Sequence, residues 1–309
     1  MKRLLVIQGP TGVGKTDITL MLAEHYGCPI LNADSRQLYR DMPIGTAAPT
    51  LEQQQRVKHY FVGMLGVEQE YNAGQYEREA VSLLEQLFQK HEVLILSGGS
   101  MMYVDAVCKG FDDLPDVKPE IRSEVQQRLH DEGLGALQEQ LRLLDPAYYE
   151  QVDLRNPQRV CHALELCLQT GSAYSSLRIG RAKKRNFSIF KVGLTMPREQ
   201  LYERINKRVE QMIDMGLAQE AHRLLQPYVG DILPNSLNTV GYKELMQVER
   251  GEWTLEFAVG QIKQNTRRYA KRQLTWLRHD EDIHWININD YESKNDIISA
   301  IVAMHDSMQ

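Results

Sequence analysis

The sequence predicts an α/β fold, in which helices flank a parallel sheet and an all-helical segment is inserted into the chain. Short apolar strand patterns alternate with amphipathic helix patterns before residue 112 and again after residue 186. This alternation is typical of crossover connections between parallel strands. Residues 112–186 carry helix patterns only. We therefore expect a core formed by residues 1–111 and 187–309, and a helical insertion domain formed by residues 112–186.

The individual elements follow from apolar runs and from apolar residues three and four positions apart. We expect strands at residues 3–8, 29–33, 59–65, 93–97, 187–195 and 283–287. In the core we expect helices at residues 17–26, 75–91, 197–215 and 254–278, and one that follows Gly99 and ends near Cys108. In the insertion we expect helices at residues 120–131, 136–144 and 157–169, separated at Leu144-Asp145-Pro146 and at Asn156-Pro157.

The composition excludes several classes of protein. The chain has 309 residues, of which 42% are hydrophobic and 25% charged, as in an average soluble globular protein. Its aliphatic runs are too short to span a bilayer, and its first residues lack the apolar stretch of a signal peptide. The four cysteines form no C-x-x-C pair, so we expect reduced thiols in a cytoplasmic protein that does not bind membranes. The net charge of -5 excludes a uniformly basic nucleic-acid-binding protein, although it allows a basic patch.

Residues 9–16 form the most informative short motif. They match G-x-x-x-x-G-K-[ST] and lie between an expected strand and an expected helix. The glycines allow the backbone to wrap around phosphate oxygens, and the start of the helix favours an anion. Lys15 adds a positive charge, and the Thr16 hydroxyl can bind Mg²⁺. We therefore expect a P-loop NTPase-like core whose diphosphate- or nucleotide-binding residues are Gly9, Pro10, Thr11, Gly12, Val13, Gly14, Lys15 and Thr16.

This loop does not identify the reaction. In ATPases and GTPases a later apolar strand usually ends in an aspartate that binds Mg²⁺. Here the strand at residues 93–96 is followed by Ser97-Gly98-Gly99-Ser100, and the guanine-binding motif N-K-x-D is absent from the sequence. Motor-like or switch-like hydrolysis of a nucleotide is therefore disfavoured.

A carboxylate follows the second expected strand. Asp34 comes where a parallel strand beside the phosphate loop faces the ligand crevice. There it can bind Mg²⁺ through water, accept a proton from a nucleophile, or only cap the following turn. Thr46 can donate a hydroxyl to the same site or be a turn residue. Arg204 and Arg208 project from one helix face, where they can reach a diphosphate or pair with nearby glutamates.

Two stretches carry six basic residues each and no acidic residue, which suits contacts with nucleic-acid phosphates. An ordinary solvated surface is the alternative for each. The first stretch contains Arg178, Arg181, Lys183, Lys184, Arg185 and Lys191. The second contains Lys263, Arg267, Arg268, Lys271, Arg272 and Arg278, together with Tyr269 and Trp276, whose rings can stack on unpaired bases.

Taken together, these motifs resemble those of the tRNA dimethylallyltransferases, also called tRNA isopentenyltransferases. The resemblance extends over nearly the whole chain in the family's order, and its most specific motifs are Asp-Ser-Arg-Gln-Leu-Tyr and Lys-Arg-Gln-Leu-Thr-Trp-Leu-Arg. Ser100 stands where the family usually has threonine, and Val160-Cys161-His162 differs from the commoner versions of that helix. The matching segments are residues 9–16, 34–39, 42–47, 98–103, 156–163, 240–242 and 271–278.

The resemblance implies that the protein transfers a dimethylallyl group from dimethylallyl diphosphate to N6 of adenosine 37 in tRNA and releases diphosphate. It implies that Lys15, Arg208 and Mg²⁺ at Thr16 stabilise the leaving diphosphate, and that Asp34 accepts the N6 proton. The insertion would bind the anticodon stem-loop, and we expect a monomer. The implied tRNA-binding residues are Asp34, Ser35, Arg36, Gln37, Ser100, Arg122, Gln158, Arg159, Val160, Cys161, His162, Asn238, Thr239, Val240, Gly241, Tyr242, Lys243, Lys271, Arg272, Gln273, Leu274, Thr275, Trp276, Leu277 and Arg278.

Three alternatives remain from the residues alone. A small-molecule kinase would share the phosphate loop and the sheet, but it would need neither the long insertion nor two basic stretches. A P-loop RNA-binding or regulatory protein without turnover would not need Asp34 beside the loop. A prenyltransferase that acts on free adenine nucleotides would share both the loop and the acid.

Overall fold

A computed structural model describes residues 2–112, 114–178, 180 and 182–307. The chain divides into two compact units, each of which is described by itself. The core unit comprises Met1–Lys109 and Lys184–Gln309, and the helical unit comprises Gly110–Lys183.

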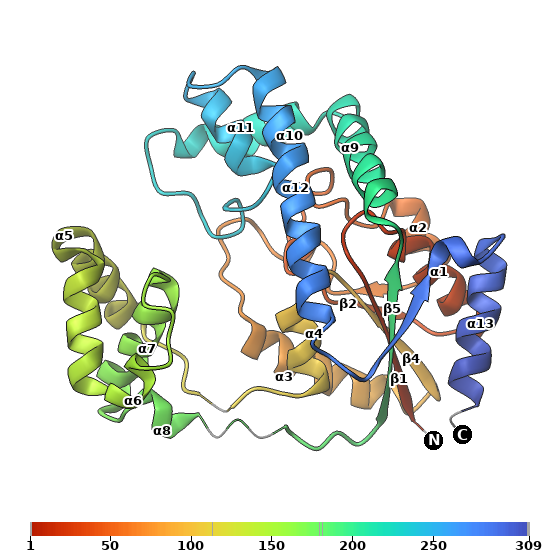
Figure 1. Cartoon of the computed structure of the whole chain (residues 1–309), viewed down its shortest axis with the longest axis horizontal. Coiled ribbons are helices and arrows are strands. Elements are labelled where there is room, and N and C mark those ends of the chain that lie inside the picture. The colour runs from red at the N-terminus through yellow and green to blue at the C-terminus, as the bar shows by residue number, and fades with distance from the viewer. Residues whose placement is uncertain (1, 113, 179, 181, 308–309) are drawn as a thin grey trace. The chain divides into compact units, whose positions relative to one another are not determined.

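The core unit is built on one parallel sheet, of which Figure 1 labels β1, β2, β4 and β5. Across the described residues its strand order is β3-β2-β4-β1-β5-β6, and every pairing is parallel. β1 lies between β4 and β5 and is buried along its whole length, which explains its continuous apolar sequence. The expected α/β fold is therefore confirmed. The strands are β1 (Arg3–Gln8), β2 (Ile30–Asn32), β3 (His59–Tyr60), β4 (Val93–Ser97), β5 (Ser188–Thr195) and β6 (Ile283–Asn287).

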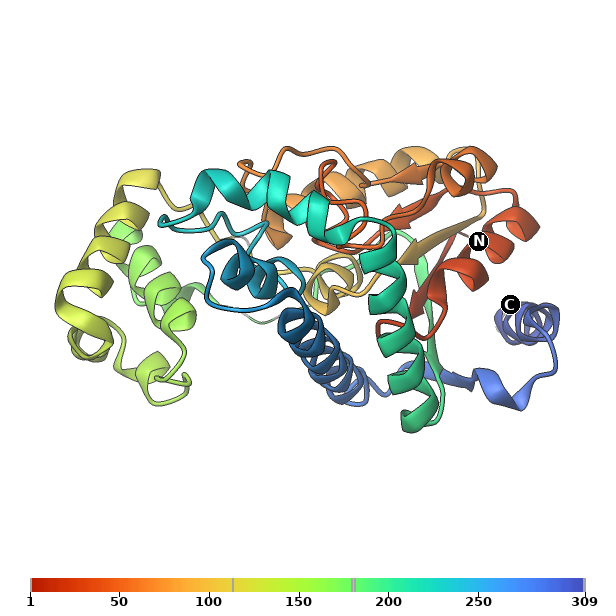
Figure 2. The same cartoon turned by 90° about the horizontal axis from the view of Figure 1, so that it is seen from above.

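The helices of the core unit pack on the sheet and on one another. α1 lies beside α13 in Figure 1, and α9 lies beside α12 in Figure 2. The phosphate loop is held against α9, because a Cβ on Gly12 would lie 2.9 Å from the Ile205 side chain. The helices are α1 (Lys15–Tyr26), α2 (Leu51–Arg56), α3 (Ala73–Leu87), α4 (Met101–Cys108), α9 (Arg198–Asp214), α10 (Leu217–Leu225), α11 (Tyr242–Glu249), α12 (Leu255–Leu277) and α13 (Lys294–Asp306), with short 3-10 helices at Gln226–Tyr228 and Ile288–Asp290.

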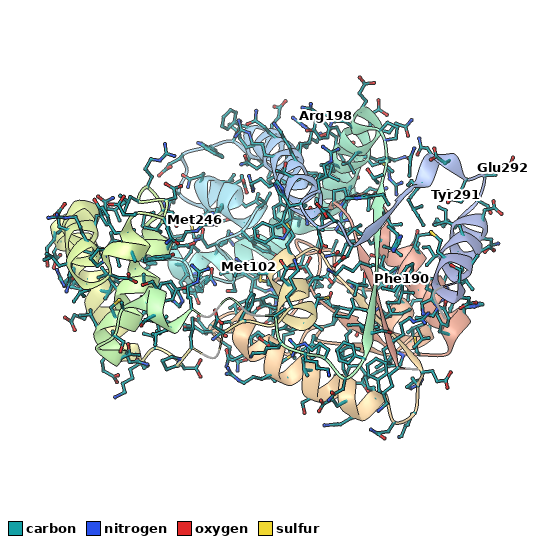
Figure 3. The ribbon with its side chains drawn as sticks, turned by 60° about the horizontal axis from the view of Figure 1, so that its bottom comes forward. Met102, Phe190, Arg198, Met246, Tyr291 and Glu292 are labelled. Atoms are coloured by element: carbon teal, nitrogen blue, oxygen red, sulfur yellow. The ribbon has the colours of Figure 1, made fainter. Side chains whose placement is uncertain are left out.

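Aromatic contacts anchor α13 to the sheet. Phe190 of β5, labelled in Figure 3, lies with its ring centroid 4.8 Å from that of His284 on β6 and 5.8 Å from that of His305 on α13. Tyr26 at the end of α1 meets the same histidine, with the Tyr26 hydroxyl 3.1 Å from His305 Nδ1. The C-terminal helix is therefore part of the core packing.

The helical unit has a hydrophobic core of its own, formed by residues such as Leu141 and Leu164. Asp145 is buried and joins its helices, since its carboxylate accepts hydrogen bonds from the Tyr148 amide (3.0 Å) and the Ser175 amide and hydroxyl (2.6 and 2.7 Å). Its helices are α5 (Pro119–Leu144), α6 (Pro146–Tyr149), α7 (Pro157–Thr170) and α8 (Tyr174–Leu177). α5 is interrupted at Gly133, whose φ of 79° and ψ of 171° are not helical, so it consists of the two helices expected there.

Three findings bear on the other expectations. The strand expected at residues 59–65 ends at Tyr60, because Phe61 and Gly63 adopt positive φ angles that turn the chain. All four cysteines are free, as expected, and the structure buries them. None of the described helices has the length and apolarity needed to cross a membrane.

Candidate functional site

The phosphate loop joins the carboxyl end of β1 to the first turn of α1. Gly9, Gly12 and Gly14 have φ angles of 150°, 85° and 101°, which residues with a Cβ rarely adopt. α1 begins at Lys15, directly after Gly14. The amide groups at this helix start are therefore available to an anion.

Lys15 is the central cation of the loop. Its Nζ donates hydrogen bonds to the carbonyl oxygens of Gly9 (2.8 Å) and Pro10 (3.0 Å). An ammonium group has three donors, so one remains for a ligand. Burial, together with the nearby positive charge of Arg208, lowers the pKa of Lys15 from 10.5 to about 8, while the Asp34 carboxylate acts in the opposite direction. The site therefore has an excess of positive charge that a phosphate group would compensate.

Two hollows meet beside the loop, and we name them the phosphate hollow and the wide hollow. The phosphate hollow, with a volume of about 130 Å³, is lined by five loop residues and by Asn32, Ser97 and Gln273; the loop residues are Thr11, Gly12, Gly14, Lys15 and Thr16. The wide hollow, of about 340 Å³, is lined by residues that include Arg36, Val240 and Lys243. Both share Thr11, Asp34, Thr46, Arg208 and Tyr269. A ligand bound at the loop would therefore face a second ligand across Asp34 and Arg208.

Asp34 lies two residues after β2. Its Oδ1 accepts a hydrogen bond from the Arg36 amide at 3.0 Å, so the carboxylate does cap the following turn. In the described part of the chain, Oδ2 has no hydrogen-bond donor, and the side chain lines both hollows. One oxygen thus fixes the orientation of the carboxylate, and the other is available for proton transfer.

Two arginines of α9, Arg204 and Arg208, face the loop. Arg208 lines the two hollows, and its burial lowers the pKa of its guanidinium although Asp34 opposes this shift. A Cβ on Gly14 would lie 3.2 Å from Arg204 Nη2, so Arg204 also lies against the loop. The possible competing partner Glu210 is paired instead with Lys263, at 2.6 Å.

The turn after β4 packs against residues 33–35 and holds them in place. A Cβ on Gly98 would overlap the backbone of Ala33, which excludes any larger residue there. The Ser100 amide donates to the Ala33 carbonyl at 3.1 Å, and the Ser100 hydroxyl accepts from the Ser35 amide at 2.8 Å. Serine at position 100 keeps the hydroxyl that this contact requires. The hydrogen bonds among Ala33, Ser35 and Ser100 hold Asp34 at the carboxyl edge of the sheet.

A buried carboxylate, which the sequence did not reveal, anchors the segment that carries Thr46. Glu220 on α10 accepts hydrogen bonds from the amides of Ile44 (2.9 Å) and Gly45 (2.8 Å) and from the Tyr242 hydroxyl (2.6 Å). A Cβ on Gly45 would overlap the Tyr242 ring, so glycine is required there. Glu220 lies far from every recognisable motif in the sequence, and only the fold brings it to this segment.

Thr46 is a turn residue, which is one of the two roles expected for it, and its hydroxyl does not donate into the hollows. Its hydroxyl donates to the Met42 carbonyl at 2.7 Å, although the residue lines both hollows. Gln37 donates to the carbonyl oxygens of Thr46 and Ala47, both at 3.1 Å. Gln37 and Thr46 therefore shape the wall of the site.

The residues present fit a magnesium ion only with help from a ligand. Among the described residues, no cluster of three or more histidine, cysteine or carboxylate side chains can hold a metal. Mg²⁺ commonly keeps several waters and binds one or two protein groups together with substrate phosphates. The exposed Thr16 hydroxyl, at the start of α1 and in the phosphate hollow, suits that mode of binding.

The implied tRNA-binding residues divide by exposure. Gln158, Arg159 and His162 are exposed on α7. Partial desolvation of the His162 ring and, to a smaller extent, the positive charge of Arg122 lower the pKa of that histidine. In the core unit the exposed members are Asn238, Lys243, Lys271, Arg272, Thr275, Trp276 and Arg278; those partly buried are Asp34, Ser35, Arg36, Gln37, Ser100, Thr239, Val240 and Leu274.

Six of these residues are buried in this structure, and five of them require correction. Val160 and Cys161 belong to the core of the helical unit. Gly241, Tyr242, Gln273 and Leu277 are buried in the core unit. Gly241 has no side chain and lines the wide hollow, so it stays in the set. The side chains of the other five pack inside the fold, and so we remove those five from the set of direct tRNA contacts.

The first basic stretch also requires correction. Arg185 is almost fully buried, pairs with Glu77 at 3.0 Å and donates to the carbonyl oxygens of Ala106 and Val107. Lys191 is buried on β5 and pairs with Asp280 at 2.8 Å. Arg178 lies over the rings of Tyr148 and Tyr174, and Arg181 lies outside the described residues. Lys184 remains an exposed cation of this stretch.

The second stretch is only partly free for RNA. Lys263 is paired with Glu210, and Arg267 donates to Asn206 Oδ1 at 2.6 Å. Arg268, Lys271, Arg272 and Arg278 are exposed. The basic surface of α12 is therefore concentrated toward its C-terminal end, next to the exposed Trp276 ring, whose Nε1 donates to Asp105 at 3.2 Å.

Comparison with known proteins gives a consistent result. The family model described as IPP transferase matches residues 37–280. A protein of Bacteroides fragilis named tRNA dimethylallyltransferase 1 is 52% identical and aligns with 98% of this chain and 98% of its own. Its namesake from Phocaeicola vulgatus is 55% identical over 92% of this chain and 93% of its own.

Solved structures share the fold. The crystal structure of full-length tRNA isopentenylpyrophosphate transferase from Bacillus halodurans has a TM-score of 0.71 and 33% identity, and the alignment covers 98% of this chain and 96% of that one. A eukaryotic dimethylallyltransferase acting on tRNA has a TM-score of 0.79 over 93% of this chain and 74% of its own, at 24% identity. The second similarity concerns the fold alone.

Proposed function

The chain belongs to the IPP transferase family, and from this premise we propose that it transfers a dimethylallyl group from dimethylallyl diphosphate to N6 of adenosine 37 in tRNA. Relatives with about half of their residues identical along nearly the whole chain are tRNA dimethylallyltransferases, and this chain is an enzyme of that class. The observation that carries the detailed proposal is the meeting of Lys15, Arg208 and Asp34 where the two hollows join.

The phosphate loop binds the diphosphate of the donor. The amides at the start of α1, the third donor of Lys15 and the guanidinium of Arg208 supply positive charge where the leaving group develops negative charge. These groups are fixed before the ligand arrives, because the loop and α9 pack together. Thr16 and the diphosphate oxygens would hold Mg²⁺, which adds positive charge at the leaving group.

The acceptor adenine occupies the wide hollow, after leaving its stack in the anticodon loop. The allylic C–O bond breaks, and its electrons stay with the diphosphate. N6 forms a bond to the freed carbon, and the N6 proton passes to Oδ2 of Asp34. An exocyclic amine is a weak nucleophile, so a fixed carboxylate at the junction of the two hollows is needed for proton removal.

Exposed cations and an exposed indole support tRNA binding on α12. Lys271, Arg272 and Arg278 suit phosphate contacts, and Trp276 suits stacking on an unpaired base. In the helical unit, Arg122, Gln158, Arg159 and His162 are the proposed contacts with the anticodon stem-loop. We further propose that the protein acts as a monomer, because one core unit supplies the loop, the base and the arginine.

The reaction can be tested directly. The protein is incubated with unmodified tRNA, dimethylallyl diphosphate and Mg²⁺, and nucleosides from the digested tRNA are examined by mass spectrometry. We expect one dimethylallyl group on adenosine 37 and none on AMP or ATP in parallel reactions. Prenylation of the free nucleotides alone, or phosphorylation of a small molecule without prenylation of tRNA, would overturn the proposal.

The metal site has a separate test. Thr16→Ala should weaken diphosphate binding in the presence of Mg²⁺ but change it little in the presence of EDTA, because the hydroxyl acts through the metal. Equal weakening under both conditions would show that Thr16 binds the diphosphate directly and does not hold the ion.

A further inference from the structure

Gln273 on α12 belongs to the implied tRNA-binding motif, but its side chain is only 1% exposed. Its Oε1 accepts a hydrogen bond from the Thr11 amide at 2.8 Å, and its Nε2 donates to the Gly99 carbonyl at 2.8 Å. A backbone amide only donates and a carbonyl only accepts, so these two partners fix the orientation of the Gln273 side chain. The residue thus connects α12 to two different loops.

The first of these loops is the phosphate loop. Thr11 lies between Gly9 and Gly12, both of which have positive φ angles. Lys15 and the Val13 amide form hydrogen bonds with carbonyl groups within the loop. In the described ranges of the chain, Gln273 is the side chain from outside the loop that hydrogen-bonds its backbone. Because the glycines give the loop little rigidity of their own, this external bond restricts its conformation.

The second loop is the turn after β4, which supports Asp34. A Cβ on Gly99 would lie 2.9 Å from Gln273 Nε2 and 3.2 Å from Asp34 Oδ2. The Tyr269 hydroxyl also donates to the Gly99 carbonyl, at 3.2 Å. One buried amide therefore fixes the backbone that binds the diphosphate relative to the backbone beside the proposed base.

We propose that Gln273 is a positioning residue of the diphosphate site and not a contact with tRNA. Its neighbours in the motif support this division of roles, because Lys271, Arg272 and Thr275 are exposed while Gln273 lies on the opposite, buried side of α12. The inference rests on the proposed function in one respect, namely that the loop binds a diphosphate. The residue acts through the Thr11 amide and the Gly99 carbonyl, both of which lose a partner when it is replaced.

The test compares Gln273→Met, which keeps the volume and removes both hydrogen bonds, with Lys271→Ala two residues earlier on the exposed side. Binding of inorganic diphosphate with Mg²⁺ is measured by calorimetry, and tRNA binding by filter retention, below the melting temperature of every variant. For Gln273→Met we expect the diphosphate Kd to rise roughly 10–30-fold from the loss of two buried hydrogen bonds, with the tRNA Kd within about twofold of the parent's. Lys271→Ala should show the reverse pattern.

Kinetics and hydrogen exchange separate positioning from a purely structural role. Gln273→Met should raise KM for dimethylallyl diphosphate and lower kcat while leaving KM for tRNA unchanged, and it should speed amide exchange at residues 9–16. If Gln273→Met does not fold, Gln273→Asn, which is one methylene too short to bridge both partners, is measured instead. A lower melting temperature with parental diphosphate affinity would overturn the inference, as would a loss of tRNA affinity alone.

Lys15→Met distinguishes failure of this inference from failure of the proposed function. If the parent protein does not bind diphosphate, or if Lys15→Met binds it as the parent does, the proposed function is wrong. If the parent binds diphosphate through Lys15 and Gln273→Met binds it equally well, only the role of Gln273 is wrong.

Discussion

The lowered pKa of Lys15 predicts that diphosphate binding weakens at moderately alkaline pH. With a pKa of about 8, Lys15 is about 90% charged at pH 7 and about 10% charged at pH 9. If the diphosphate binds only the charged form, its Kd should rise about tenfold between these values. An ordinary exposed lysine would stay charged over the whole range.

Raising the pH should weaken diphosphate binding, but it should increase the stability of the ligand-free protein. The folded pKa lies below the unfolded value of 10.5, so between about pH 8 and 10.5 the unfolded chain binds more protons than the folded one. Stability of the ligand-free protein therefore increases with pH through this window, as far as Lys15 determines it. Bound diphosphate adds negative charge beside Nζ and restores the proton.

The assay is calorimetry with inorganic diphosphate at pH 7, 8 and 9, at constant free Mg²⁺ and in two buffers of different ionisation enthalpy. The control is Lys15→Arg, which remains charged and shares any titration of the ligand itself. The ratio of parental to Lys15→Arg Kd should rise about tenfold, and the parent should take up about half a proton at pH 8. Equal pH slopes for the two proteins, without proton uptake, would refute the reasoning that burial and Arg208 disfavour the charged lysine.

Three further predictions concern the wall of the site and the surface. Asp34→Asn should lower single-turnover rates by roughly 10²–10⁴-fold, as loss of a general base does, and near-parental chemistry would exclude that role. Gly45→Ala should lower the melting temperature, because its Cβ overlaps the Tyr242 ring; an unchanged melting temperature would mean that the ring moves freely. Lys184→Ala should reduce the slope of log K for tRNA binding against log salt concentration by roughly 0.7–0.9, because one phosphate contact is lost. Arg185→Ala should instead destabilise the fold by about 3 kcal/mol, as removal of one partner from a buried ion pair does. Salt-dependent tRNA binding measures the first effect, and denaturant titration measures the second.

The sheet could be predicted because the sequences of buried parallel strands are continuous apolar runs. β1 and β4 are paired from Arg3 with Val93 to Ile7 with Ser97, and the sequences of both are apolar along most of this length. Short elements such as α2, which buries no side chain, give no periodic pattern and were not expected. α13 was also not expected, although Ser293 and Asp296 form a capping box before its buried isoleucines.

Within the site, the residues of contiguous motifs could be predicted, but their partners across the fold could not. Lys15 and Asp34 carry chemistry that their local pattern indicates. Glu220 anchors a segment 175 residues away, at Gly45, and the bond from Thr11 to Gln273 spans 262 residues. No local period or spacing encodes such pairs, since they depend on how helices pack over the carboxyl edge of the sheet.

The burial of some residues of the motif at residues 271–278 can be predicted from the sequence. It is missed when the whole motif is treated as one tRNA-contacting surface. Gln273 and Leu277 are four residues apart, so they lie on one side of a helix. Ala270 lies on the same side and is also buried. Helical periodicity applied inside the motif separates this buried side from the exposed Lys271 and Thr275. The residues of one motif on a helix therefore face both the protein interior and the exposed surface.

Ser97 at the end of β4 is more consistent with transfer of the dimethylallyl group than with transfer of a phosphoryl group. Ser97 lies where many nucleotide hydrolases carry a carboxylate for Mg²⁺, and its hydroxyl forms a hydrogen bond with Thr19 Oγ1 at 2.9 Å. In the hollows, the carboxylate of Asp34 therefore offsets only part of the positive charge of Lys15 and Arg208. A second carboxylate would cancel the remaining positive charge. A diphosphate that departs intact, with its charge increasing as the allylic bond breaks, needs that positive charge more than it needs a second anchor for the metal.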